Sequence, residues 1–148
     1  MPIRDRIVWL AKSIAIGFLL ALPLSYIMTA LYLDSVHAHA SLQEFTLVMI
    51  VLSFISGIIL QNYVLVCVSD LFSFIFAVFI SASIIVYNVF LPFINVEDAS
   101  SLLTIIFLTS ANLIDNTFII VFFLITPFIP IFGVLGVFIS QHLMESLS

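Results

Sequence analysis

The stretch Leu71–Val96, LFSFIFAVFISASIIVYNVFLPFINV, decides the fold class of this chain, because it contains no acidic or basic residue. A helix rises about 1.5 Å per residue, so about 20 residues cross the hydrocarbon core of a bilayer, which is roughly 30 Å thick. The stretch is longer than this requirement. It therefore predicts a transmembrane helix.

The composition of the whole chain agrees with this interpretation. Of its 148 residues, 64% are hydrophobic and 7% are charged, whereas soluble domains have roughly 45–50% apolar and about 25% charged residues. The mean hydropathy is +1.40, and a small soluble fold leaves too much of its surface exposed to hide so many apolar side chains. The sequence predicts an all-α fold, a polytopic transmembrane helix bundle that forms a single integral membrane domain over residues 1–148.

The other charge-free stretches predict how many times the chain crosses the membrane. We expect four spans, at about 14–32, 42–60, 71–93 and 117–141. The last span contains Pro127 and Pro130, which predict a kinked helix because proline cannot donate the helical hydrogen bond. The stretch 101–114 is short for a crossing and is expected to be an interfacial or re-entrant element. The alternative is that it begins a fifth span.

The basic residues predict the orientation. Arg4, Arg6 and Lys12 are the only lysines and arginines in the chain, and all precede the first span. Cytoplasmic flanks carry the excess of such residues, so we expect a multi-pass protein of the cell membrane with a cytoplasmic N-terminus. Trp9 suits the membrane interface. Three basic residues cannot form a nucleic-acid-binding patch. A signal peptide cleaved near residues 38–40 is the less favoured alternative, because the apolar run is longer than an h-region.

One carboxylate interrupts the apolar C-terminal part of the chain. Asn112, Asp115 and Asn116 are three and four residues apart, so they share one face of a helix. A carboxylate at membrane depth is costly and is a functional candidate by default. The three residues are therefore a candidate ion or proton site, or a polar intramembrane site. The alternative is a polar turn in which Asp115 or Asn116 caps the last span.

Two histidines are weak candidates for a metal site. His37 and His39 stand in the polar loop after the first span, and imidazoles bind zinc and copper. Their spacing is not specific, and a solvated loop is the favoured interpretation. His142 is expected on the opposite side of the membrane, which argues against a haem held by two histidines. No cofactor is expected.

The remaining polar residues are expected to serve structure. Asp70 is predicted to cap the N-terminus of the third span. Pairs of small residues four positions apart allow helices to approach closely. Such pairs occur at Ser13/Gly17, Ser53/Gly57 and Gly136/Ser140.

Enzymatic sequence motifs are absent from the chain. It has no G-x-S-x-G, H-E-x-x-H, P-loop or G-x-G-x-x-G pattern. We therefore expect an accessory or structural subunit of a membrane complex, without catalysis of its own. Its expected partners are the lipid bilayer and other membrane subunits or a second copy of the chain. The alternatives are a small oligomeric ion or solute transporter or channel that uses the Asn112/Asp115/Asn116 face, and a membrane enzyme or metal-site protein that uses His37 and His39.

Overall fold

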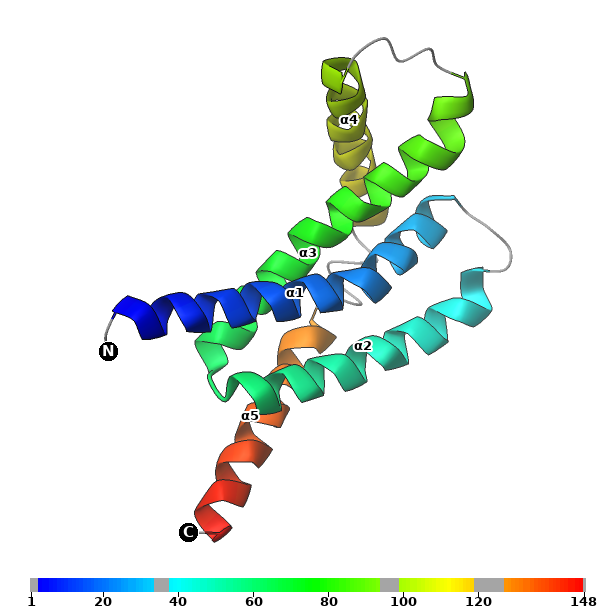
Figure 1. Ribbon diagram of the computed structural model, residues 1–148. Coiled ribbons are helices and arrows are strands. Elements are labelled where there is room, and N and C mark those ends of the chain that lie inside the picture. Colours follow the sequence, from blue (N-terminus) through cyan, green and yellow to red (C-terminus); the bar gives the residue numbers. More distant parts are fainter. Residues whose placement is uncertain (1–2, 34–37, 94–98, 119–126, 148) are drawn as a thin grey trace.

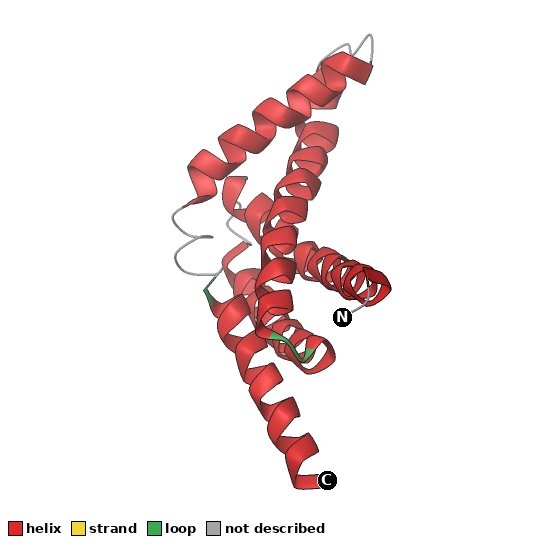
Figure 2. Ribbon diagram, turned by 90° about the vertical axis from the view of Figure 1, so that its left-hand side faces the viewer, coloured by secondary structure: helices red, strands yellow, loops and turns green. Residues whose placement is uncertain are grey.

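The computed structural model describes residues 3–33, 38–93, 99–118 and 127–147, and the elements in these ranges are helices (Figures 1 and 2). The all-α prediction is confirmed for this part of the chain. The helices are α1 (Ile3–Tyr32), α2 (Ala38–Leu60), α3 (Tyr63–Ile85), α4 (Ala99–Phe118) and α5 (Phe128–Leu147). After α3 the chain continues through a π-helical turn, η1 (Val86–Phe90), and a 3-10 turn, η2 (Leu91–Phe93).

Three helical segments in the described residues have the length and composition of membrane spans. They are Ile7–Tyr32, Tyr63–Phe90 and Ile129–Ser146. Two further apolar helical segments are shorter, Thr46–Leu60 and Ser100–Asp115. A helical bundle suited to a membrane is therefore supported, whereas the four or five spans expected from the charge-free stretches are not confirmed by the described residues.

Helices α1 and α3 form the centre of the bundle. A Cβ atom added to Gly17 of α1 would lie 2.6 Å from the carbonyl oxygen of Ser69 in α3, so the two backbones touch there. Further along both helices, the hydroxyl of Ser81 donates a 2.8 Å hydrogen bond to the carbonyl oxygen of Ser25. Because residue numbers increase in the same direction along both helices from one contact to the next, α1 and α3 run parallel.

Small side chains explain this close approach. The face of α3 that is buried repeats a small residue every four positions, and residues four apart lie on one side of a helix. These residues are Ser69, Ser73, Ala77 and Ser81, all buried. The apolar core next to them comes from α1, α2 and α3 and from the ends of α4 and α5; it includes Leu20, Leu24, Ile27, Met28, Met49, Val78, Ile85, Leu113 and Ile129.

Helices α2 and α5 meet through glycines. A Cβ atom on Gly57 would lie 2.8 Å from the carbonyl carbon of Gly133, and one on Gly136 would lie 3.1 Å from the carbonyl carbon of Phe54. The hydroxyl of Ser53 also donates to the carbonyl oxygen of Ile129 at the start of α5. The expectation that these small residues allow close approach is confirmed, and the order of the contacts shows that α2 and α5 run parallel.

The start of α3 corrects two predictions. The helix begins at Tyr63, whereas the third span was expected from Leu71. Its cap is Asn62, whose side-chain oxygen accepts hydrogen bonds from two amides of the first turn, at 2.9 and 3.3 Å. Asp70 lies inside the helix, so the prediction that it caps the span was wrong. An Asn in extended conformation just before the helix supplies the cap instead.

The last predicted span, a kinked helix over 117–141, is only partly covered by the described residues. Helix α4 includes Thr117 and Phe118, residues 119–126 lie outside the description, and α5 begins at Phe128 after a turn at Pro127. Pro127 directly precedes α5, and Pro130 lies in its first turn. Amides in the first turn have no partner within the helix, so proline costs little there and marks the beginning of a helix.

Helix α4 includes the short element expected at 101–114 and packs against the C-terminal part of α3. Ser83, near the end of α3, lines a groove with Leu103, near the beginning of α4. Phe74, earlier in α3, lines another groove with Ile114, later in α4. The order of the contacts is reversed between the two helices, so α4 runs antiparallel to α3. Helix α5 packs against the opposite end of α3 and is also antiparallel to it. Helices α4 and α5 therefore point in the same direction, one beside each end of α3 (Figure 1).

The turn between α2 and α3 marks one end of the bundle. Gln61 there has a positive φ of 51°, which reverses the chain in a short turn. Its side-chain amide donates a 3.1 Å hydrogen bond to the hydroxyl of Ser140 in α5. Gln61 also lines a pocket with Trp9, which stands near the beginning of α1. The N-terminal part of α1 and the C-terminal half of α5 therefore lie at the same end of the bundle.

The contact between α2 and α5 generates the first testable prediction. We expect Gly57→Val to separate the two helices, because a side chain there meets the backbone of α5. Forcing side-chain atoms into a close-packed contact costs about 1–3 kcal/mol or more. Thermal unfolding of the purified protein in mild detergent measures this loss. The control Val51→Ile adds one methylene at an exposed position of α2 and should change stability by no more than about 0.5 kcal/mol. Equal stability of Gly57→Val and wild type would contradict the contact.

Candidate functional site

The most unusual polar side chain in the described part of the bundle is Asp70. It lies on α3 within the candidate span Tyr63–Phe90, and only 7% of its surface is exposed. Neither carboxylate oxygen has a hydrogen-bond partner among the described residues. A buried polar group without a partner is costly, and an ionisable side chain inside a membrane span is a functional candidate.

The position of Asp70 follows from the helical repeat. Val66, one turn earlier, faces α5, because a Cβ atom on Gly133 would lie 2.5 Å from its Cγ1 atom. Ser69, the preceding residue, presents its carbonyl oxygen to Gly17 of α1. Residues four apart share a helical face. Asp70 therefore belongs to the buried face of α3 at the level where α1 and α5 both approach it.

The hydroxyl groups near Asp70 donate elsewhere. Ser69 donates a 2.8 Å hydrogen bond to the carbonyl oxygen of Val66, and Ser73 donates a 2.7 Å bond to the carbonyl oxygen of Asp70 itself. Each serine has one hydroxyl hydrogen, so neither can donate to the carboxylate at the same time. The hydroxyl oxygens keep lone pairs and can still accept a hydrogen bond. The immediate surroundings therefore suit a protonated carboxyl group, which can donate a hydrogen bond. They suit a carboxylate less well, because it can only accept one.

The described residues of the expected site on α4 have different surroundings. The side-chain amide of Asn112 donates a 3.1 Å hydrogen bond to the hydroxyl of Tyr32 on α1. Asp115 is exposed, and Asn116 is in the helix with its side chain outside the described part. Neither Asp115 nor Asn116 caps the last helix, because α4 continues to Phe118 and α5 begins later. That alternative was wrong, whereas an ion or proton site on this face stays a prediction.

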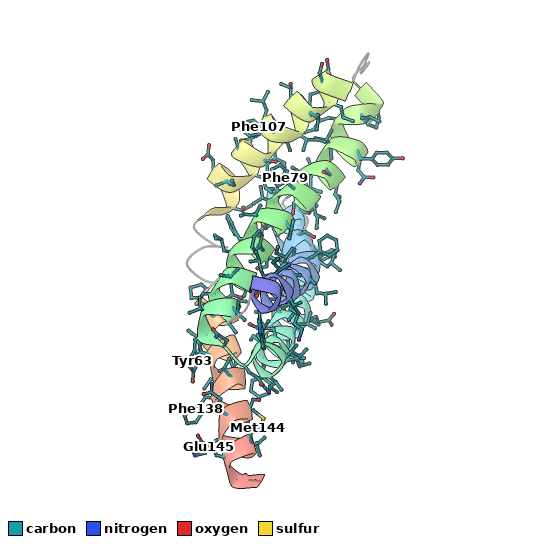
Figure 3. The ribbon with its side chains drawn as sticks, turned by 60° about the vertical axis from the view of Figure 1, so that its left-hand side comes forward. Tyr63, Phe79, Phe107, Phe138, Met144 and Glu145 are labelled. Atoms are coloured by element: carbon teal, nitrogen blue, oxygen red, sulfur yellow. The ribbon has the colours of Figure 1, made fainter. Side chains whose placement is uncertain are left out.

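The expected metal candidates fall largely outside the described residues. His37 lies in the range 34–37, which is not described, and His39 is in the first turn of α2 with its side chain outside the description. Among the described side chains, no three His, Cys, Asp or Glu residues come together. His142 Nδ1 lies 3.8 Å from a carboxylate oxygen of Glu145 on the exposed C-terminal part of α5. Figure 3 shows this part of α5, where Glu145 is labelled, extending beyond the other helices.

The grooves of the bundle are apolar, and charged side chains do not line the three described here. A pocket of about 620 Å³ lies between the N-terminal part of α1 and the turn from α2 to α3. Another of about 520 Å³ is formed by α1, α2 and α3. A third, of about 510 Å³, lies between α3 and α4, with Phe79 and Phe107 on its walls (Figure 3). Such grooves suit lipid chains or apolar helices, and Asp70 does not line any of them.

Sequence reasoning did not identify Asp70 as a buried residue, because the ends of the spans were placed at charged residues. That procedure puts every acidic residue at the end of a span. The signal that places Asp70 inside a helix was the repeat of small residues at 69, 73, 77 and 81, which continues through it with a four-residue period. The signal for the helix start was Asn62, a favourable cap residue.

The hydrogen bond between α1 and α4 generates the second testable prediction. Tyr32→Phe removes the hydroxyl that Asn112 contacts and should destabilise the protein by about 0.5–1.5 kcal/mol in thermal unfolding. In a double-mutant cycle with Asn112→Ala, the two losses should be less than additive. Tyr87→Phe removes the hydroxyl from a tyrosine that is 70% exposed and serves as the matched control. Strictly additive losses would show that the bond does not contribute.

No protein family, curated protein sequence or solved structure matches this chain. The geometry of its own residues therefore carries the functional argument.

Proposed function

We propose that this chain is a small integral membrane protein of the cell membrane that acts as an accessory or structural subunit of a membrane complex, without catalysis of its own. The observation that carries the proposal is the open arrangement of the last two helices. In the span Ile129–Ser146 only 28% of the residues are buried, against 44% in an 18-residue apolar window of Ile7–Tyr32. On α4, Leu103, Phe107 and Leu108 are each about two-thirds exposed. Contiguous apolar surface of this kind is covered by lipid or by a partner.

The groove between α3 and α4 supports a partner helix at this surface. Its walls combine large apolar side chains with the hydroxyl groups of Ser83 and Thr104. Both hydroxyls donate to carbonyl oxygens of their own helices, so they bring no unsatisfied donor to the groove. Apolar and hydroxyl-bearing surfaces of this kind are typical of contacts between transmembrane helices.

The proposed topology has four crossings, with a cytoplasmic N-terminus. Consecutive full spans must run in opposite directions, whereas α4 and α5 point the same way beside opposite ends of α3. We therefore propose that α5 makes the fourth crossing and that α4 enters the bilayer beside α3 without crossing it. An even number of crossings agrees with the position of the beginning of α1 and the end of α5 at one end of the bundle. The basic residues before the first span favour the cytoplasm for that end.

A second candidate function is a small oligomeric ion or solute transporter or channel. The expected site for it contained Asp115, which is exposed, and Asn112, which bonds to Tyr32. The observation that favours ion handling is instead the buried carboxyl of Asp70. Within the described residues it is the acidic side chain with the least exposure.

The subunit proposal generates the third testable prediction. When the tagged full-length protein is cross-linked in intact membranes and purified in mild detergent, we expect one species of fixed stoichiometry, larger than a single chain. Phe107→Ala should weaken this species, by about 2 kcal/mol or roughly 30-fold in affinity if the phenylalanine anchors the partner. Leu47→Ala, which truncates an exposed side chain on α2, is the matched control.

Two outcomes contradict the subunit proposal. One is a wild-type protein that remains a single chain after cross-linking. The other is ion or solute flux through proteoliposomes that contain only this chain, which would favour the transport function. If Phe107→Ala leaves the assembly intact, the partner does not bind in the groove between α3 and α4.

A further inference from the structure

We propose that Asp70 is a proton-binding site inside the bundle, at which the carboxyl group holds a proton while α1, α3 and α5 are packed together and releases it when water reaches the site. The ligand is a proton, and this site is separate from the surface through which a partner subunit would bind. The proposal rests on the burial of the side chain, on the missing hydrogen-bond partners and on the absence of a nearby positive charge in the described structure.

The first step of the argument concerns charge. An ionised carboxylate in an apolar interior needs an opposite charge or several donors, because the low dielectric leaves it without the hydration that water would give. Asp70 is 7% exposed, and its two oxygens have no donor among the described groups. A neutral carboxyl group avoids most of that cost, since it needs only one acceptor for its own hydrogen.

The second step concerns the ionisable groups on every helix of the bundle. All the other described acidic, basic, histidine and cysteine side chains are exposed: Lys12 on α1, Glu44 on α2, Cys67 on α3, Asp115 on α4, and His142 and Glu145 on α5. Lys12 lies over the Trp9 ring, 5.0 Å from its centre, and His142 pairs with Glu145. The described structure therefore offers Asp70 no buried counter-ion.

The third step separates a proton from a metal ion. A divalent cation such as calcium or magnesium takes six or more oxygen ligands, commonly from more than one carboxylate. The described residues hold no group of three possible His, Cys, Asp or Glu ligands. A proton needs only the one carboxyl group, so the described surroundings of Asp70 fit it better.

The fourth step couples the proton to helix packing. On release, the O–H bond of the carboxyl group breaks, its electron pair stays on the carboxylate, and the proton passes to water to form hydronium. Water must first reach a side chain that is only 7% exposed, on a helix whose neighbouring residues Ser69 and Val66 pack against Gly17 and Gly133. Binding of the proton therefore favours the packed arrangement of α1, α3 and α5, and its release accompanies a looser one.

The experiment uses the purified full-length protein in mild detergent and the hydrophobic reagent dicyclohexylcarbodiimide, which reacts with protonated carboxyl groups in apolar surroundings. Mass spectrometry should find the adduct on the peptide that contains Asp70. Once the carboxyl ionises, the protonated fraction and with it the labelling should fall about tenfold for each further pH unit. Asp70→Asn should remove the adduct from that peptide, whereas Asp115→Asn should leave labelling at Asp70 unchanged.

An infrared measurement provides a test that needs neither reagent access nor the folding of Asp70→Asn. Aspartates in contact with water are ionised above about pH 5. With isotope-labelled aspartate in the Asp115→Asn variant, a carbonyl stretching band that persists above that pH and disappears in alkali therefore reports a buried protonated carboxyl. Carboxylate bands alone above that pH would overturn the proposal. Loss of the band and of the adduct when sodium is added at constant pH would also overturn it, because the site would then bind a cation.

Discussion

The close contact of helix backbones through small residues is the constraint on which the rest of this structure depends. In a membrane the hydrophobic effect does not drive helices together, because lipid chains are as apolar as the side chains that they replace. Packing at short range must do so instead. Gly17 meets the backbone of α3, and Gly57 meets the backbone of α5. These two contacts fix the parallel pairs α1–α3 and α2–α5, and α3 joins the pairs through Val66 against Gly133.

The same packing creates the chemical peculiarity of the bundle. Small residues bring α1 so close to α3 that Ser81 donates a 2.8 Å hydrogen bond to Ser25 across the two helices. Ser69 and Ser73 on the same face donate to carbonyl oxygens of α3 itself. Hydroxyls used in this way satisfy the backbone but leave Asp70 without a donor. A carboxyl group in this position is tolerated more easily with its proton than without it. Structural packing and a proton site thus occupy one face of α3.

The sequence allowed much of the fold to be predicted. The charge-free stretches indicated apolar helices, and the small-residue pairs indicated where helices approach. It misplaced the start of α3. The error has one physical cause: a charged residue was taken to mark the end of a helix wherever it stands. Asp70 can lie within a helix when tertiary contacts cover it, and Pro130 is harmless in a first turn.

The sequence by itself determined the class of the protein, because hydropathy and the lack of charge are properties of composition that no arrangement of the chain alters. It also determined which residues are small enough for close contact. Only the tertiary structure decided which of these residues meet, since pairing depends on the relative direction and depth of helices distant in sequence. It likewise distinguished two acidic residues of the apolar helices. Asp115 is exposed and Asp70 is buried, a difference set by the helices that pack against each residue.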